Sequence, residues 1–291
     1  MVADLETQTA ARRVPDDAAE PDEIVIRPRP GWIAIDWREL VRTRELLYFL
    51  VWRDVKIRYK QTALGVAWAV LQPLLTMLIF TAIFGRFAQI PSDGVPYPIF
   101  VYAGLIPWTF FANGVAQAGE SLVSQQHLLT KIYLPRLFIP TAAVGAFLVD
   151  LAISLGFYAA LLAFYRIAPS PGIVLVPILI TLTLLATLGL GYLLGALTVA
   201  YRDFRYIIPF LIQILLYLSP VIYPVSIVPV RYQAILALNP MCGIVDAYRS
   251  AILGTPWNLV TLAISSTSAV LLFALGLFYF RKTERRFADI A

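Results

Sequence analysis

The side chains of this sequence that could support acid–base, nucleophilic or metal chemistry are few and widely separated. Asp150 is the one acid well inside a long apolar stretch, and the chain holds one histidine, His127, and one cysteine, Cys242. A single cysteine cannot form an internal disulfide or a multi-cysteine metal site. A single histidine argues in the same way against a histidine-rich metal site. We therefore expect no metal centre and no resident cofactor.

Asp150 and His127 each allow two interpretations. An acid within a membrane span is costly and usually faces protein or water, and a proton-coupled carrier would use such a group. Without a partnered cation or second carboxylate it makes a poor proton relay, so a local hydrogen bond to a Ser or Tyr is favoured. His127 is better explained as a solvated loop residue or a partner contact than as a proton carrier.

Motifs for catalysis are absent from the sequence. There is no G-x-x-x-x-G-K-[ST] phosphate loop, no G-x-S-x-G elbow and no H-E-x-x-H pair. The chain is therefore not expected to be an enzyme or to hydrolyse ATP itself. Energy for any transport must come from an ion gradient or from another subunit.

The composition indicates the elements that position these residues. Hydrophobic residues make up 59% of the chain and charged residues 14%, with a mean hydropathy of +0.75. Such a chain is predicted to be an all-α polytopic membrane protein. A bilayer core needs about 20 apolar residues per helix. Six segments are predicted to span the membrane: 64–84, 99–118, 141–165, 173–201, 207–223 and 259–280. The fifth is short and is interrupted by Pro209 and Pro220.

The remaining segments complete the expected organisation. Residues 1–31 are polar and predicted to form a disordered cytoplasmic tail, residues 32–62 an interface segment, 63–280 the transmembrane domain and 281–291 a cytoplasmic tail. Residues 230–253 are half apolar and are interrupted by Asn239 and Pro240. We expect them to form two short re-entrant helices between the fifth and sixth spans.

The distribution of Lys and Arg predicts the orientation. Fifteen of these residues flank the spans on the side of both termini, and four lie on the other side. Cytoplasmic loops carry the excess of basic residues, so both termini should be cytoplasmic and the re-entrant pair should face outward. The net charge of +5 is thus explained without nucleic acid.

A basic helix is predicted immediately before the first span. Arg53, Lys56 and Lys60 fall on one stripe at helical spacing, and Asp54 can pair with Arg58 at i, i+4. The opposite face is formed by Leu47, Val51, Val55 and Tyr59 and is flanked by Tyr48 and Trp52. This pattern is typical of an amphipathic helix in the membrane interface. It could serve only as an anchor, or it could also dock a partner.

The connection between the second and third spans, residues 119–140, is longer than a simple connector needs. A short helix is expected over 121–132, stopped by Pro135. Contact with a cytoplasmic protein is the favoured role for this segment.

Aromatic residues are abundant within the predicted spans. Sugar rings stack their CH faces on aromatic planes, but aromatics are also good packing residues in a membrane. For any single residue, packing is the favoured interpretation.

Several sequence blocks, taken together and in order, resemble the membrane subunit of type-2 ABC exporters of polysaccharide, which include O-antigen, capsule and teichoic-acid permeases. The blocks are RDVKIRYKQTALGVAWAVLQPLLTMLIFTAIFG, YAGLIPWTFFANG, SLVSQQHLLTKIYLPRLFIP, YRDFRYIIPFLIQILLYLSPVIYP, NPMCGIVDAYRSAILG and ERRFADIA. They cover about residues 46–290.

The resemblance implies a permease homodimer in the bacterial inner membrane with two cytoplasmic ATPase subunits that bind ATP and magnesium. A long polymer would slide through a continuous tunnel lined by aromatic rings. The aromatic candidates are Trp68, Tyr102, Trp108, Phe110, Phe111, Tyr217 and Tyr223.

The same resemblance assigns three further groups of residues. The interface helix would act through Arg53, Lys56, Arg58 and Lys60. ATPase coupling would involve Gln125, Gln126, His127, Leu128, Leu129, Lys131, Pro135 and Arg136. The outward gate would involve Asn239, Pro240, Asp246, Tyr248 and Arg249.

Two alternative functions stay open. A small-molecule ABC exporter would enclose an apolar pocket in place of an aromatic tunnel. An ion-coupled carrier or flippase would need no ATPase and would lose transport on Asp150→Asn, whereas the ABC interpretation expects little effect of that change.

Overall fold

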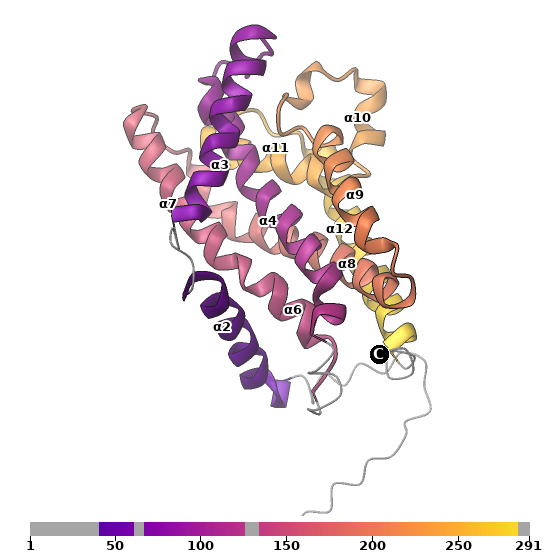
Figure 1. Ribbon diagram of the computed structural model, residues 1–291. Coiled ribbons are helices and arrows are strands. Elements are labelled where there is room, and N and C mark those ends of the chain that lie inside the picture. Colours follow the sequence, from indigo (N-terminus) through magenta and orange to yellow (C-terminus); the bar gives the residue numbers. More distant parts are fainter. Residues whose placement is uncertain (1–40, 61–66, 126–133, 285–291) are drawn as a thin grey trace, which may run out of the picture. The chain divides into compact units, whose positions relative to one another are not determined.

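The computed structural model describes residues 41–60, 67–125 and 134–284, which all belong to one compact unit, Ile33–Ala291. These described residues form helices and no strands (Figure 1), which confirms the all-α prediction. The expected tail over residues 1–31 lies outside the described residues.

Among the described residues, five helical stretches are long and apolar enough to cross a membrane: Ala67–Phe87, Tyr97–Ser124, Phe138–Phe164, Pro171–Ala200 and Leu259–Glu284. They overlap five of the six predicted spans. They comprise α3 (Ala67–Phe80) with the π-helical η1 (Thr81–Phe87), α4 (Tyr97–Ser124), α6 (Phe138–Gly145) with α7 (Phe147–Phe164), η2 (Pro171–Leu175) with α8 (Val176–Ala200), and α12 (Leu259–Glu284).

The predicted fifth span, residues 207–223, is shorter than expected. Helix α9 (Phe204–Leu218) has 15 residues, or about 22 Å, against a bilayer core of about 30 Å. It ends because Pro220 disfavours helical geometry at the preceding residue, and Ser219 is extended. The chain then passes through η3 (Val225–Ile227), α10 (Val230–Leu236) and α11 (Pro240–Leu253), which correspond to the two short helices expected over 230–253.

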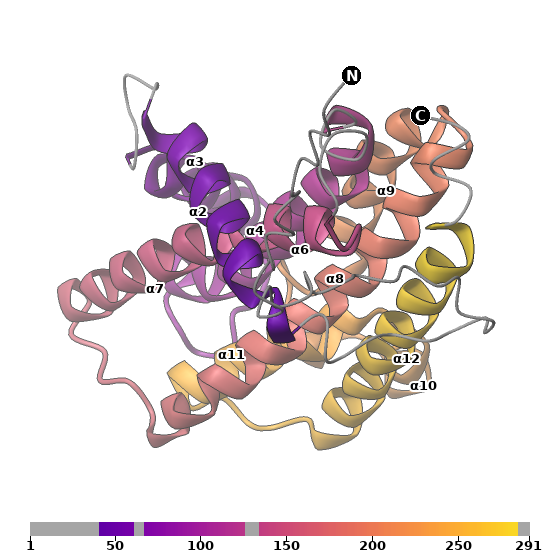
Figure 2. The same ribbon diagram turned by 90° about the horizontal axis from the view of Figure 1, so that it is seen from below.

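Helix α4 is the central element of the bundle. It contacts α3, α6, α7, α8, α9 and α11, and Figure 2 shows α7 and α12 on opposite sides of it. Because most of its side chains are buried, its apolar residues serve as the core of the chain.

Glycines allow a close contact between two helices. A Cβ atom on Gly276 of α12 would overlap with the carbonyl oxygen of Gly189 on α8. Small residues of this kind let helix backbones approach each other in membrane proteins. A larger side chain at either position would separate α8 from α12.

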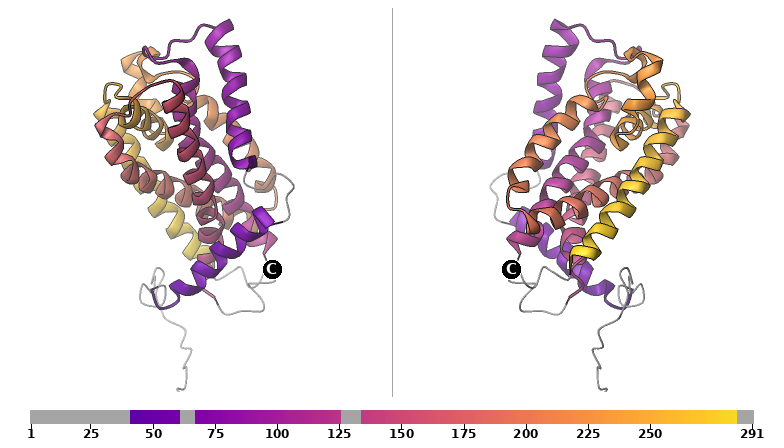
Figure 3. Two further views of the ribbon diagram at one scale, coloured as in Figure 1. Left: turned by 90° about the vertical axis from the view of Figure 1, so that its left-hand side faces the viewer. Right: turned by 90° about the vertical axis from the view of Figure 1, so that its right-hand side faces the viewer.

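Helix α3 is far less buried than α4, and it leans on α4 and α7. Helix α2 (Arg44–Lys60) packs on α6, where Val51 meets the backbone at Gly145. Helix α2 and the C-terminal ends of α4 and α12 lie at one end of the bundle, and α10 lies at the other end (Figures 1 and 3). The distribution of Lys and Arg predicts the first group on the cytoplasmic side of the membrane and α10 on the outer side.

Candidate functional site

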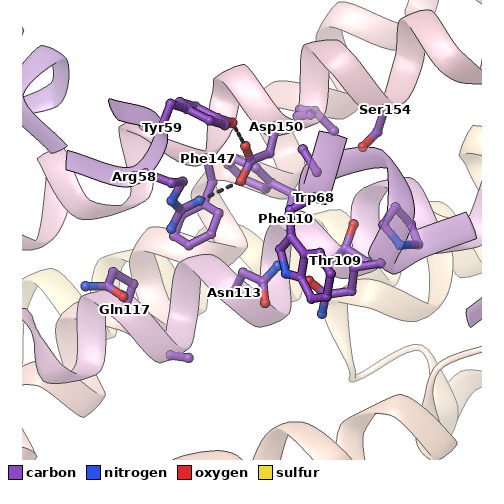
Figure 4. A pocket seen from close by; sticks show the side chains of 15 residues that line it. Arg58, Tyr59, Trp68, Thr109, Phe110, Asn113, Gln117, Phe147, Asp150 and Ser154 are labelled. Atoms are coloured by element: carbon purple, nitrogen blue, oxygen red, sulfur yellow. Dashed lines mark hydrogen bonds and ion pairs between the residues drawn. The ribbon is translucent and has the colours of Figure 1, made fainter. Parts of the chain in front are cut away.

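A cavity of about 680 Å³ lies between α3, α4 and α7, next to the end of α2 (Figure 4). Its volume falls within the range of small-molecule sites. It is lined by Arg58, Tyr59, Trp68, Ala69, Gln72, Pro73, Thr109, Phe110, Asn113, Ala116, Gln117, Phe147, Asp150, Leu151 and Ser154.

An ion pair forms one wall of this cavity. Arg58 Nη1 of α2 lies 2.5 Å from Asp150 Oδ2 of α7, and the Tyr59 hydroxyl donates to the other carboxylate oxygen. The guanidinium carbon of Arg58 also lies 3.5 Å from the ring centroid of Phe147. These contacts tie α2 to α7.

The ion pair corrects two expectations and confirms one. Asp150 has a partnered cation, contrary to the prediction, while the expected hydrogen bond from a tyrosine is present. The predicted i, i+4 pair of Asp54 with Arg58 is wrong, because Asp54 accepts from the neighbouring Arg53 at 2.8 Å. Arg58 instead reaches a carboxylate that lies on another helix.

Amide side chains form the rest of the polar wall. Within the part of the chain that the structure describes, the side chains of Gln72, Asn113 and Gln117 make no hydrogen bond to protein. Each amide has two N–H donors and one carbonyl acceptor. Water or a ligand must therefore satisfy them.

This polar row is not among the residues predicted for the site, although its spacing is visible in the sequence. Thr109, Asn113 and Gln117 recur every fourth residue of α4, so they lie on one face of the helix. Amides at this spacing in an apolar span indicate a polar cavity.

The aromatic candidates fall into two groups. Tyr102, Trp108 and Phe111 are buried in the core, and Tyr102 stacks on Tyr158 with ring centroids 5.6 Å apart. In this conformation the chain's own helices enclose the three rings. Trp68, which is 52% exposed, lines the cavity, and Phe110 also lines it although its side chain is buried in the core like the other three.

The two aromatic candidates near the end of α9 lie apart from this cavity. Tyr217 is exposed, and the Tyr223 hydroxyl donates to its carbonyl oxygen at 3.2 Å. Neither residue lines the cavity, so their role in a substrate path stays a prediction.

The coupling segment is described only at its two ends. Gln126, His127, Leu128, Leu129 and Lys131 lie outside the described residues. Residues 121–124, expected to begin a separate helix, are instead the last turn of α4.

The two described ends of this segment contact other helices. Gln125 Oε1 accepts a hydrogen bond of 2.7 Å from Arg53 of α2. At the other end, next to Pro135, Arg136 donates to the carbonyl oxygen of Glu284. The carboxylate of Glu284 also pairs with Arg281 at 2.7 Å. The segment is thus joined to α2 at one end and to the end of α12 at the other.

The exposed face of α2 mixes cations with aromatic rings. Lys56 lies 5.5 Å from the ring centroid of Trp52, and Lys60, Phe49 and Ile57 are exposed beside them. The prediction that Trp52 flanks the face opposite the cations is wrong. That opposite face packs on the protein's own helices, so the exposed face is the one suited to a lipid interface.

The predicted gate residues are buried or half-buried at the two ends of α11, Pro240–Leu253, and two of them make polar contacts with neighbouring segments. Asn239 caps α11 by accepting from the Met241 amide at 3.1 Å, and it donates to Ser219 Oγ at 2.9 Å. Pro240 occupies the first turn of α11, where a missing N–H is tolerated. The start of α11 is therefore fixed to the segment that follows α9.

Arg249 is the centre of a hydrogen-bond network. Its side chain is 1% exposed and donates to the carbonyl oxygens of Phe100, Pro220 and Val221 at 3.1, 2.6 and 2.7 Å. It also lies 3.6 Å from the ring centroid of Phe100. Arg249 thus joins α11, α4 and the turn after α9 in one place.

Burial dominates the electrostatics of α11. It lowers the pKa of Arg249 to about 10, against the opposing attraction of Asp246. It raises the pKa of Asp246 to about 6, although Arg249 acts in the opposite direction. Tyr248 and Arg249 are both fully buried, so these two side chains hold the helix in place and present no open surface.

No metal site is apparent in the described parts of the chain. No group of three His, Cys, Asp or Glu side chains lies within reach of a common ion there. The cavity offers amides, hydroxyls, aromatic rings and one neutralised ion pair, which suit a polar ligand without formal charge.

Known proteins align with most of this chain. It is 31% identical to the O-antigen export system permease protein RfbA of Myxococcus xanthus over 85% of this chain and 96% of that protein. It is 26% identical to the protein of the same name from Klebsiella pneumoniae, covering 84% and 95%. The polysialic acid transport protein KpsM of Escherichia coli is 25% identical over 69% of this chain and 78% of its own length.

The family comparison covers the described helices from α2 to α11. The model of the ABC-2 type transporter family matches residues 45–253, a range that includes the cavity, the Arg58–Asp150 pair and the Arg249 network. The chain belongs to the ABC-2 type transporter family.

Proposed function

We propose that this chain is the membrane permease of an ATP-driven exporter that moves a polysaccharide or lipid-linked glycan of O-antigen or capsule type across the inner membrane. The observation that carries this proposal is the near full-length match to an O-antigen export permease, 96% of which is covered. The cavity supports it, because its amides and aromatic rings suit sugar residues better than the purely apolar pocket of a drug exporter.

The active assembly is two copies of this chain with two copies of a cytoplasmic ABC ATPase. ATP and magnesium bind to the ATPase, since this chain has no phosphate-binding loop. The family membership and the long segment between α4 and α6 support such a partner.

In this assembly, α2 and the coupling segment carry the motion of the ATPase to the spans. Arg53 binds Gln125 at the beginning of the segment, and Arg58 binds Asp150 on α7. A displacement of the segment is therefore passed to α2 and from α2 to one wall of the cavity.

The assembly crosses the membrane with both termini in the cytoplasm. Helix α9 acts as the remaining span, and α10 and α11 face outward as the gate. Support comes from the excess of Lys and Arg near the termini and from the position of α10 at the end of the bundle opposite α2 (Figure 3).

Deletion of the gene in its own bacterium tests the function. We expect loss of a surface polysaccharide and its accumulation inside the cell, both reversed by the intact chain. Affinity purification of the complementing chain in detergent should also recover an ABC ATPase. Normal surface polysaccharide in the deletion strain, or purification without any ATPase, would contradict the proposal.

A further inference from the structure

The charges that line the cavity neutralise one another. Arg58 and Asp150 are the charged residues among its lining side chains, and they form a hydrogen-bonded pair at 2.5 Å. The Phe147 ring covers the guanidinium, and the Tyr59 hydroxyl takes the second carboxylate oxygen. Among the described lining residues, an anionic ligand would thus find no cation other than Arg58, which Asp150 already neutralises.

The uncharged groups provide the recognition surface. Gln72 lies on α3, while Asn113 and Gln117 lie on α4, so amides come from two walls of the cavity. They can donate to and accept from the hydroxyl groups of a neutral ligand at the same time. Their lack of protein partners among the described residues leaves this capacity unused.

Aromatic surface complements these amides. Trp68 of α3 and Phe110 of α4 line the cavity near Asn113 (Figure 4). An indole ring offers a broad apolar face, against which the CH face of a pyranose ring can stack. A sugar ring needs groups that hydrogen-bond to its hydroxyls beside an aromatic plane for its CH face, and this cavity provides both.

We propose that this cavity, within a single protomer, is a binding subsite for one or two uncharged sugar residues of the transported glycan. The subsite lies beside α2, so the glycan meets it on entry, at the end of the bundle where α2 contacts Gln125. Sugars that carry a carboxylate or phosphate are disfavoured because the Arg58 guanidinium is already paired with Asp150. This proposal rests on the proposed function and specifies the sugar class for one site.

Site-directed photocrosslinking tests the subsite with the native glycan. The photoreactive residue p-benzoylphenylalanine replaces Gln117 of α4 or, separately, Gln72 of α3, both of which are exposed to the cavity. The matched control position is Val260 on α12, which is 70% exposed and does not line the cavity. Cells that export the glycan are irradiated, and adducts of the purified full chain are analysed for sugar by mass spectrometry.

We expect glycan adducts at Gln117 and Gln72 at about ten times the level at Val260, a difference that corresponds to about 1.4 kcal/mol of preferential occupancy. The released sugars should be free of carboxylate and phosphate. Adding Trp68→Ala to the Gln117 variant should lower the adduct several-fold while the chain remains in the membrane.

Other outcomes overturn the proposal. Continued export without glycan adducts at either position, or adducts made of lipid alone, would show that sugar does not enter the cavity. An acidic glycan in the adduct would overturn the neutral class. Failure of the unmodified chain to support any glycan export would instead count against the proposed function.

Discussion

Two arginines hold this molecule together in opposite ways. Arg58 joins α2 to α7 through a side-chain carboxylate, beside a cavity, with 29% of its side chain exposed. Arg249 joins α11 to α4 and to the turn after α9 through main-chain carbonyls, and it is only 1% exposed. A side-chain pair at a cavity can break and re-form as helices shift, whereas a buried network with the backbone can release only if the local fold opens.

The regions around Arg58 and Arg249 have different roles. The Arg249 network surrounds the beginning of the well-packed α4 and provides a rigid scaffold. The Arg58 region adjoins α3, most of whose side chains are not buried by the rest of the chain. The cavity there leaves space for a ligand and for a shift of α2 or α3. Changes in the first region should act on folding, and changes in the second should act on export.

The largest effect is expected from Arg249→Met. This change removes the donors to three buried carbonyl groups and should destabilise the protein by about 3–5 kcal/mol. Thermal unfolding of the purified chain, monitored by size-exclusion fluorescence, measures the loss. Arg231→Met is the matched control, because Arg231 is exposed on α10 and its removal should change stability by less than about 0.5 kcal/mol. Equal stability of the two variants would refute the scaffold role.

A smaller effect on stability and a larger effect on export are expected at the Arg58–Asp150 pair. Asp150→Asn leaves the guanidinium without its carboxylate and should cost about 1–2 kcal/mol, since the pair is only partly buried. Export should fall clearly, so the earlier expectation of little effect is revised by the ion pair.

The matched double variant separates this coupling from proton transport. Arg58→Met with Asp150→Asn removes both charges and should recover part of the export lost in Asp150→Asn alone. Export assayed across a range of external pH should keep the same profile in all variants. A carrier mechanism would be indicated if the double variant were as inactive as Asp150→Asn and the proton gradient, rather than ATP, sustained wild-type export.

The Arg53–Gln125 contact should contribute less to stability. One hydrogen bond of 2.7 Å between partly buried side chains is worth about 0.5–1.5 kcal/mol. Arg53→Ala and Gln125→Ala should each slow ATP-driven export, and the double variant should be no slower than the single ones. Additive losses in this double-mutant cycle would show that the two residues act separately.

Trp68→Ala should have the smallest effect on folding. The ring is half exposed, so stability should change by less than about 0.5 kcal/mol, while export falls because a stacking surface of the cavity is lost. Trp68→Phe should retain most of the export. The buried counterpart Trp108→Ala should instead lose about 3–5 kcal/mol of stability. Unchanged export in Trp68→Ala would remove the ring from the substrate path.

The sequence predicted the fold better than the site. Uninterrupted apolar segments identified five spans because hydropathy and length act locally. The shortness of α9 depends on Pro220, which lies inside the predicted span 207–223 and ends the helix before the span ends. The two short helices over 230–253 followed from Asn239 and Pro240, which form a cap and a first turn.

The contacts of the site depend on long-range neighbours. Local spacing suggested Asp54 as the partner of Arg58, but the partner is Asp150, on a helix 92 residues away in sequence. Likewise, α4 is apolar on several sides, so the sequence could not show that Tyr102 faces the core while Phe110 faces the cavity. The regular spacing of Asn113 and Gln117 was the one local signal for this wall.

Hydrogen–deuterium exchange of the permease–ATPase complex tests the contrast between the two regions most directly. Exchange is measured by mass spectrometry without nucleotide and with ATP trapped by vanadate. We predict that trapping changes the exchange of α2 and α3, while residues 97–106 and α11 keep theirs, because the Arg249 network is rigid. Unchanged exchange in α2 and α3, together with a change centred on α11 and residues 97–106, would contradict the account.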